Sequence, residues 1–134
     1  MSENELLKMA MDARSRAYAK YSGFAVGAAL LTSSGKVFQG CNVENISLGL
    51  TMCAERVAIG AAVADGNTKF VSIAIMADST VPIMPCGACR QVLAEFSPDL
   101  RIVTSTMSGQ RETVQLDELL PHPAQGILDP PKNV

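Results

Sequence analysis

The chain has 134 residues, of which 48% are hydrophobic and 4% aromatic, and its formal net charge at pH 7 is −2. This length and apolar content can bury the core of one domain, which excludes an intrinsically disordered tail. The slightly acidic balance and the scarcity of aromatic residues argue against a nucleic-acid polymer as partner, and no apolar run approaches the length that spans a bilayer.

The first part of the chain predicts a helix followed by a β-hairpin. Ser2 and Glu5 form an S-x-x-E capping box, and apolar residues then recur at helical spacing until about Tyr18. Residues 25–32 are rich in apolar side chains and predict a strand that is buried on both faces. A Ser-Ser-Gly-Lys turn follows, and residues 37–44 predict the returning strand of the hairpin.

The rest of the chain mixes helices and strands. Residues 52–64 predict a helix that is apolar nearly all round and therefore buried on several sides, in part by partner subunits. The remaining predicted elements are a strand at 70–76, a helix at 86–96, strands at 101–105 and 113–115, a helical turn at 116–120 and a Pro-rich C-terminal arm at 121–134. We therefore predict the α/β class, a three-layer α/β/α sandwich on a mixed five-stranded sheet, in a single domain, residues 1–134.

Three cysteines and one glutamate carry the strongest chemical signal in the sequence. Cys53-Ala54-Glu55 is followed at a distance by Pro85-Cys86-Gly87-Ala88-Cys89. Three thiolates can hold Zn²⁺ while its fourth position stays open to water, which is the layout of a catalytic zinc site. Glu55 lies two residues after the first ligand and can act on that water without being a ligand itself. We predict Cys53, Cys86 and Cys89 as metal ligands and Glu55 as the catalytic acid and base.

Two other uses of these cysteines fit the sequence less well. A redox C-x-x-C motif would leave Cys53 and Glu55 unexplained, and the thioredoxin-like βαβ start is missing. A structural four-cysteine site would need Cys41, which falls in a strand-like stretch without a C-x-x-C partner and reads more simply as a small buried hydrophobe. Because zinc-binding thiols persist in a reducing compartment, we expect a cytoplasmic protein.

Charged residues near the ligands are candidates for tuning the metal. Three thiolates outweigh the charge of Zn²⁺, and Arg56, next to Glu55, is predicted to offset the excess with its permanent positive charge and several hydrogen-bond donors. Arg90 is a second candidate, although an ordinary ion pair explains it equally well. The only histidine, His122, lies in the Pro-rich arm and is predicted to be a solvated bystander.

Four segments together resemble the small cytidine deaminases, the homotetrameric kind with a three-cysteine zinc site. They are Tyr21-Ser22-Gly23-Phe24-Ala25-Val26-Gly27-Ala28, Gly40-Cys41-Asn42-Val43-Glu44-Asn45, Cys53-Ala54-Glu55-Arg56 and Pro85-Cys86-Gly87-Ala88-Cys89-Arg90-Gln91. The resemblance, which runs from about Tyr18 to Leu120, implies a cytidine deaminase-like fold, one Zn²⁺ per subunit and a homotetramer. It also implies hydrolytic deamination of cytidine and deoxycytidine in pyrimidine salvage. In that reaction Glu55 would deliver a proton to ring nitrogen N3 and a later one to the departing amino group.

The sugar of such a substrate has candidate ligands in the predicted hairpin. Asn42 and Glu44 are two residues apart on a strand, so their side chains point to the same face. An amide beside a carboxylate suits a sugar diol, although the residues alone leave open a strand end that turns into solvent. In the resembling family the matching pair holds the ribose, and Phe24 packs near the sugar. Ala54 can offer its backbone N–H to the pyrimidine carbonyl.

Two departures from the family pattern bear on the identity of the substrate. Many relatives carry a tyrosine in place of Leu48 and a phenylalanine in the C-terminal arm, whereas this chain has no aromatic residue after Phe96. The alternative is therefore a deaminase of another aminopyrimidine nucleoside, such as blasticidin S, although the Asn42 and Glu44 pair favours a plain ribose. The alternative from another class is a zinc-stabilised interaction module without turnover, against which Glu55 argues.

Overall fold

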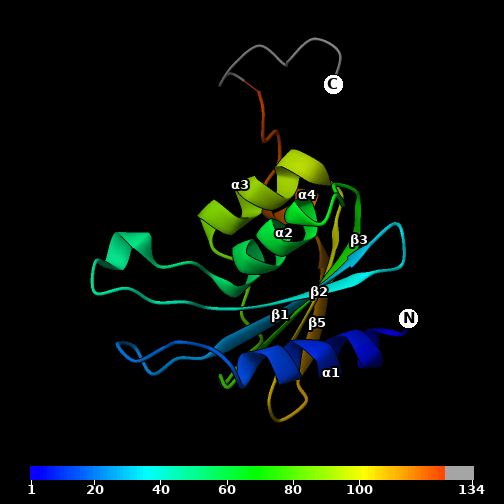
Figure 1. The fold of residues 1–134 in the computed structure, drawn as a ribbon. Helices are drawn as coiled ribbons and strands as arrows, with labels where there is room; N and C mark the ends of the chain where they lie inside the picture. Colours follow the sequence, from blue (N-terminus) through cyan, green and yellow to red (C-terminus); the bar gives the residue numbers. More distant parts are fainter. Residues whose placement is uncertain (126–134) are drawn as a thin grey trace.

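The fold is a mixed five-stranded sheet with helices on both faces (Figure 1). The computed structural model describes residues 1–125. In chain order its elements are α1 (Glu3–Arg14), β1 (Val26–Thr32), β2 (Val37–Cys41), the 3₁₀ helix η1 (Leu48–Leu50), α2 (Ala54–Ala64), β3 (Phe70–Ala77), α3 (Gly87–Phe96), β4 (Arg101–Thr106), β5 (Arg111–Gln115) and α4 (Leu116–Leu119). The strand order is β2-β1-β3-β4-β5, in which β3 and β4 are parallel and the other neighbours antiparallel.

Helices cover the two faces of the sheet unequally. α1 lies on one face, and α2 and α3 lie on the other (Figure 1). The predicted three-layer α/β/α sandwich is therefore confirmed. Within the described residues no helix combines the length and the apolar character needed to cross a membrane.

The central strands supply both halves of the hydrophobic core. Along β1, Ala28 and Leu30 pack with α2 and α3, whereas Ala29 packs with α1. Strand β3 alternates in the same way, with Ile75 on the first face and Ala74 on the second. This period of two follows from the pleat of a strand. It explains why a continuous apolar run predicted a strand that is buried on both faces.

Helix α1 ends at Arg14 and not near Tyr18 as its apolar spacing predicts. Tyr18 forms an isolated parallel bridge with Val43, and its N–H donates to the carbonyl oxygen of Asn42 at 2.9 Å. A residue held extended in such a bridge cannot continue a helix. Ala17 keeps the helical spacing in the sequence, but the pairing of distant segments overrides that local preference.

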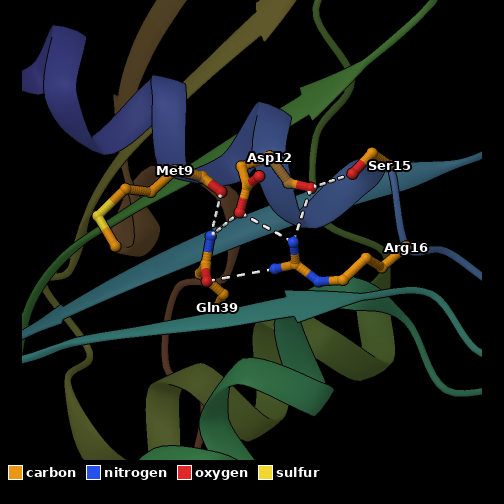
Figure 2. Close-up of polar contacts among 5 residues, drawn as sticks. All are labelled: Met9, Asp12, Ser15, Arg16 and Gln39. Atoms are coloured by element: carbon orange, nitrogen blue, oxygen red, sulfur yellow. Dashed lines mark hydrogen bonds and ion pairs between the residues drawn. The ribbon is translucent and has the colours of Figure 1, made fainter.

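A polar network fastens the last turn of α1 to the edge strand β2 (Figure 2). The Oδ2 atom of Asp12 accepts hydrogen bonds from Nη1 of Arg16 and from Nε2 of Gln39, both at 2.9 Å. The same Nε2 of Gln39 donates to the carbonyl oxygen of Met9 at 2.9 Å. The hydrogen bond from Arg16 is the main reason that the pKa of Asp12 lies below its ordinary value. The network fixes where the chain leaves the helix.

Strand β2 ends at Cys41, three residues before the predicted end at Glu44. The next residue, Asn42, accepts a hydrogen bond at Oδ1 from the backbone N–H of Val26 at 2.9 Å. The side chain thus replaces one of the two ladder bonds at this position, while the backbone N–H of Asn42 still donates to the carbonyl oxygen of Val26 at 3.2 Å. Val43 then pairs with Met52, just before α2. The chain stays extended, but it has left the sheet.

Gly40 lets β2 approach α2 closely. A Cβ atom at this position would lie 2.2 Å from the carbonyl oxygen of Ala54 and 2.5 Å from the backbone nitrogen of Ala58. Only glycine leaves room for this contact between backbones. The contact sets the position of the first turn of α2, which carries Glu55.

Helix α2 is less buried in the described chain than its composition predicts. Ala58, Ile59 and Ala62 face the core, but Gly60 and Val63 are exposed. The loop before the helix, which contains η1, extends away from the sheet (Figure 1). Three of its apolar side chains are exposed, namely Ile46 at 81%, Leu48 at 71% and Leu50 at 67%.

Candidate metal centre and active site

Two helix starts bring the three predicted metal ligands together. Cys53 is the N-cap of α2 and Cys86 the N-cap of α3, and neither side chain makes a capping hydrogen bond. Cys89 follows in the first turn of α3. The three Sγ atoms lie within 4.8 Å of one another, and those of Cys53 and Cys86 are 3.7 Å apart. Tetrahedral Zn²⁺ with Zn–S bonds of about 2.3 Å needs S···S separations of about 3.8 Å, so this thiol set fits the ion.

The thiols do not share one electrostatic environment. Burial raises the pKa of the Cys86 thiol, but the nearby backbone N–H groups of Cys89 and Ala88, together with the neighbouring thiols, bring it below its ordinary value. Burial is also the main reason that the pKa of the Cys89 thiol is raised far above its ordinary value, and the nearby Glu55 adds to the effect. A coordinating divalent cation reverses such a shift, because a thiol that binds the metal ionises.

Arg56 lies against the ligands, where the sequence predicted a compensating charge. Its Nη2 atom donates to Sγ of Cys53 at 3.5 Å and to the carbonyl oxygen of Thr51 at 3.3 Å. Hydrogen bonds to Cys53 and then to Cys89 raise the pKa of the guanidinium above its usual range. Its Nε atom is buried and has no hydrogen-bond partner among residues 1–125. The side chain is therefore held mainly by the metal-ligand turn.

Glu55 is almost completely buried beside the thiols, with 4% of its surface exposed. Burial raises the pKa of this carboxyl, and hydrogen bonds from its own backbone N–H and from Cys89 offset the rise only in part. A carboxyl in this environment holds a proton more readily than one in water. That is the property that a group passing protons to and from a substrate requires.

A cavity of about 280 Å³ opens in front of the metal centre. It is lined by Ser22, Phe24, Val26, Asn42, Glu44, Cys53, Ala54, Glu55, Ile83, Met84 and Cys86. Five of these residues are ones for which the sequence predicted a substrate or catalytic role, namely Phe24, Asn42, Glu44, Ala54 and Glu55. None of the lining side chains, all within the described part of the chain, is a lysine, arginine or histidine. The cavity therefore offers carboxylates, thiols and apolar surface to a ligand, but no cation.

The predicted sugar ligands shape the wall of this cavity. Asn42 donates from Nδ2 to the carbonyl oxygen of Phe24 at 2.8 Å, in addition to accepting from Val26. Glu44 accepts at Oε1 from the backbone N–H groups of Tyr21 and Ser22, both at 3.0 Å, and at Oε2 from the Ser22 hydroxyl. The hydrogen bond from that hydroxyl is the main reason that the pKa of Glu44 is lowered. The pair thus holds the loop that carries Phe24, and Glu44 stays ionised.

A protein family with a zinc-binding region matches most of this chain. The family model described as "Cytidine and deoxycytidylate deaminase zinc-binding region" matches residues 1–106. The chain belongs to this deaminase family. The match includes all three thiols and Glu55, so the zinc site is a property of the family as well as of the geometry.

Individual relatives agree with the family match. A cytidine deaminase of Halalkalibacterium halodurans is 47% identical over 122 residues, which cover 90% of this chain and 92% of the relative. The crystal structure of a cytidine deaminase from Burkholderia pseudomallei has a TM-score of 0.88 at 48% identity and covers 91% of this chain and 98% of that one. A blasticidin-S deaminase of Bacillus cereus is more distant, at 31% identity over 104 residues that cover 72% of this chain and 74% of the relative.

Some residues that shape this deaminase cavity were not predicted from the sequence. Ile83 and Met84 line it, and their position directly before Pro85 was an available signal. Thr104 anchors that segment from β4, because its buried hydroxyl donates to the carbonyl oxygen of Ile83 at 2.6 Å. Ser22 lines the cavity and holds Glu44. Nothing in the local sequence distinguishes Thr104 from other strand residues.

Of the two departures from the family pattern, the one at Leu48 falls outside the cavity. Leu48 lines a neighbouring hollow of about 300 Å³ together with Tyr21, Ser22, Glu44 and Thr51. His122 is exposed and has a positive φ of 54°. Of the predicted C-terminal arm, residues 126–134 lie outside the described residues. Cys41 is half-buried and is not part of the thiol cluster.

Proposed function

We propose that this chain is a zinc-dependent deaminase that hydrolyses cytidine and deoxycytidine to uridine, deoxyuridine and ammonia. One observation carries the proposal: the three-thiol cluster that fits Zn²⁺ presents Cys53 and Cys86 to the same cavity as the buried carboxyl of Glu55 and the predicted sugar ligands Asn42 and Glu44. A non-catalytic interaction module has no use for a buried acid beside an open ligand position. Pyrimidine salvage in the cytoplasm is the corresponding role.

The side chains of the cavity divide the reaction between them. Cys53, Cys86 and Cys89 would hold one Zn²⁺ per subunit, which when bound supplies a Lewis acid that lowers the pKa of a water molecule. Glu55 would take the proton from the attacking water and deliver it to N3 of the ring, which makes C4 electrophilic. The hydroxide left from that water adds to C4. Glu55 would then take the proton of the new C4 hydroxyl and pass it to the amino group, so that the C4–N bond breaks, ammonia leaves and a C4 carbonyl remains.

Other groups would bind and orient the substrate. The backbone N–H of Ala54 would donate to the pyrimidine carbonyl, because Ala54 is the first residue of α2 and that N–H has no partner within the helix. Asn42 and Glu44 would bind the ribose hydroxyls, and Phe24 would pack against the sugar. Arg56 would offset the negative charge of the thiolates by donating to Cys53.

The charge of the cavity favours a nucleoside over a nucleotide within this family. A substrate monophosphate carries a charge of about −1.5 to −2 at neutral pH. It would meet the ionised Glu44 and no cation among the lining side chains within residues 1–125. Burying a phosphate without a counter-charge is strongly unfavourable. Cytidine and deoxycytidine therefore fit this site better than deoxycytidine monophosphate.

The single domain of residues 1–134 would assemble as a homotetramer with the α2 helices near its centre. The exposed Gly60 and Val63 of α2 and the exposed apolar side chains of the η1 loop support this assembly. Apolar surface of this extent is uncommon on a monomer. A neighbouring subunit could also cover the hollow lined by Leu48, where many relatives have an aromatic residue.

One set of assays separates this function from its alternatives. Zinc content per chain is measured together with ammonia release from cytidine, deoxycytidine, deoxycytidine monophosphate and blasticidin S. We expect zinc in the protein and release from the first two substrates. Ammonia release from blasticidin S alone would support the alternative of a blasticidin-S type deaminase. The similarity to the Bacillus cereus enzyme and the missing aromatic residues are what favour that alternative. Bound zinc with no release from any substrate would support an interaction module.

A further inference from the structure

The contacts of Arg90 are explained neither by the proposed reaction nor by the ordinary ion pair that the sequence allowed for this residue. Its Nε atom donates to the carbonyl oxygen of Pro85 at 2.7 Å, and its Nη1 atom donates to the carbonyl oxygen of Leu119 at 3.2 Å. Among residues 1–125 no carboxylate forms an ion pair with it. The half-buried guanidinium therefore bridges two backbone carbonyls from segments that are distant in the chain.

The first of these carbonyls belongs to the peptide unit that leads directly into a metal ligand. The ring of Pro85 fixes its φ, so the orientation of the Pro85–Cys86 peptide depends on the ψ angle of Pro85. Because the peptide unit is planar, an anchored carbonyl oxygen also fixes the backbone nitrogen of Cys86. Pro85 is buried, and its carbonyl needs a hydrogen-bond partner. Arg90 supplies that partner from the next turn of α3.

The second carbonyl connects the same guanidinium to the end of the described chain. Leu119 is the last residue of α4. The neighbouring Gln91 donates from Nε2 to the carbonyl oxygen of Pro123 at 3.2 Å. Two consecutive side chains of α3 thus bind the segment that follows β5. The rigid guanidinium donates to the two carbonyls from two different nitrogens, which the single nitrogen of a lysine cannot reproduce.

We propose that Arg90 is a positioning residue of the metal centre. It holds the Pro85–Cys86 peptide so that Sγ of Cys86 points at the zinc position, and it links this geometry to α4. The inference rests on the zinc site of the proposed function but not on the identity of the substrate. Its test measures metal binding, so failure of the cytidine assay would leave it unaffected.

The test compares zinc affinity in Arg90→Gln, Arg90→Lys and Arg111→Gln. Arg111 is an exposed arginine that donates to Oδ1 of Asn4 at 2.6 Å, and its variant controls for loss of a guanidinium that is not near the ligands. Competition with a chromophoric chelator gives the affinity. Loss of a residue that orients a metal ligand commonly weakens binding by about 10–100-fold, which we expect for Arg90→Gln. We expect a smaller loss for Arg90→Lys and less than about a twofold change for the control.

A spectroscopic readout separates positioning from general stability. With Co²⁺ in place of zinc, the thiolate-to-cobalt charge-transfer bands report the ligand geometry, and we expect them to shift in Arg90→Gln but not in Arg111→Gln. If Arg90→Gln does not fold, Arg90→Lys carries the same two measurements. Parental zinc affinity and a parental cobalt spectrum in the folded variant would overturn the proposal. A lowered melting temperature with both metal readouts unchanged would overturn it as well.

Discussion

The Sγ atoms of Cys53 and Cys86 lie 3.7 Å apart, although the two residues are separated by 33 positions in the chain. Each cysteine begins a different helix, and the two helices are neighbours on the same face of the sheet. The metal centre is therefore built from two elements that fold separately along the chain. Its geometry depends on how those elements pack as well as on the spacing of the cysteines.

The first prediction concerns the composition of the metal centre. Cys53→Ser should lose most of its bound zinc, because serine replaces one of three thiolate ligands with a hydroxyl that binds the ion poorly. Cys41→Ser is the matched control and should keep its zinc, since Cys41 is not part of the thiol cluster. Metal analysis of the purified variants measures both. Loss of zinc in the Cys41 variant as well would point to a four-cysteine site.

Glu55→Gln should abolish most turnover while zinc and the fold are retained. A general acid and base typically contributes about 10²–10⁴-fold, and a group that moves protons twice should be at the upper end of that range. The variant should not be destabilised, because the amide removes a carboxyl whose ionisation is disfavoured by burial. Steady-state kinetics and zinc content are measured beside Glu95→Gln, an exposed glutamate of α3. Ordinary activity with full zinc would refute the proposed role.

Glu44→Gln should raise KM for cytidine more than it lowers kcat. Hydrogen bonds to charged groups contribute about 1.5–3 kcal/mol, so KM for cytidine should rise about tenfold or more. The same change removes a negative charge from the cavity, and it should narrow the preference for cytidine over deoxycytidine monophosphate. The control is Glu112→Gln on the exposed strand β5. An unchanged KM would show that the sugar binds elsewhere.

Gly40→Ala should destabilise the protein and disturb the metal centre together. The added methyl group would lie 2.2 Å from the carbonyl oxygen of Ala54, so the first turn of α2 must move. Overpacking of this kind typically costs about 1–3 kcal/mol. Urea unfolding and zinc affinity measure the two effects. Gly49→Ala is the control, because a Cβ atom there meets nothing within 4 Å. Equal stability of the two variants would contradict the close contact between β2 and α2 that the structure shows at Gly40.

The protein should be a homotetramer whose assembly depends on the η1 loop. Leu50→Glu places a charge on a side chain that is 67% exposed in the single chain, and it should reduce the assembly to smaller species. Light scattering at micromolar concentration measures the mass. Val71→Glu, at a valine that is 51% exposed on β3, is the control. A stable monomer in the parent protein would contradict the proposed assembly.

The thiol cluster could be predicted from the sequence because much of its pattern is local. Cys86 and Cys89 are three residues apart at a helix start, and Cys53 and Glu55 are two apart at another. Each spacing reports a shared helical turn without knowledge of the rest of the fold. The joining of the two halves is not local, because it depends on how α2 and α3 pack on the sheet, and the spacing between the halves indicated only that they could meet.

The details that prediction missed depend on contacts between distant segments. Helix α1 stops early because Tyr18 pairs with Val43. The sequence predicted a strand that starts at Thr113, but β5 begins at Arg111 because Arg111 pairs with Ser105 of β4. The first two residues of β5 are polar and exposed, so no alternation of apolar residues marks them as part of a strand. The partners of Arg90 are carbonyl oxygens, which any residue could supply. Such contacts leave no mark in composition or periodicity.

The uncapped starts of α2 and α3 imply a conflict between stability and catalysis. A serine or aspartate at an N-cap typically stabilises a helix by about 1 kcal/mol relative to a residue that cannot cap. Both N-cap positions here hold cysteines whose side chains make no such bond. Cys53→Ser could therefore make the metal-free protein more resistant to unfolding than its parent, even as it loses zinc. Selection for thermal stability alone would favour an inactive chain, and only selection for turnover would keep the cysteines in place.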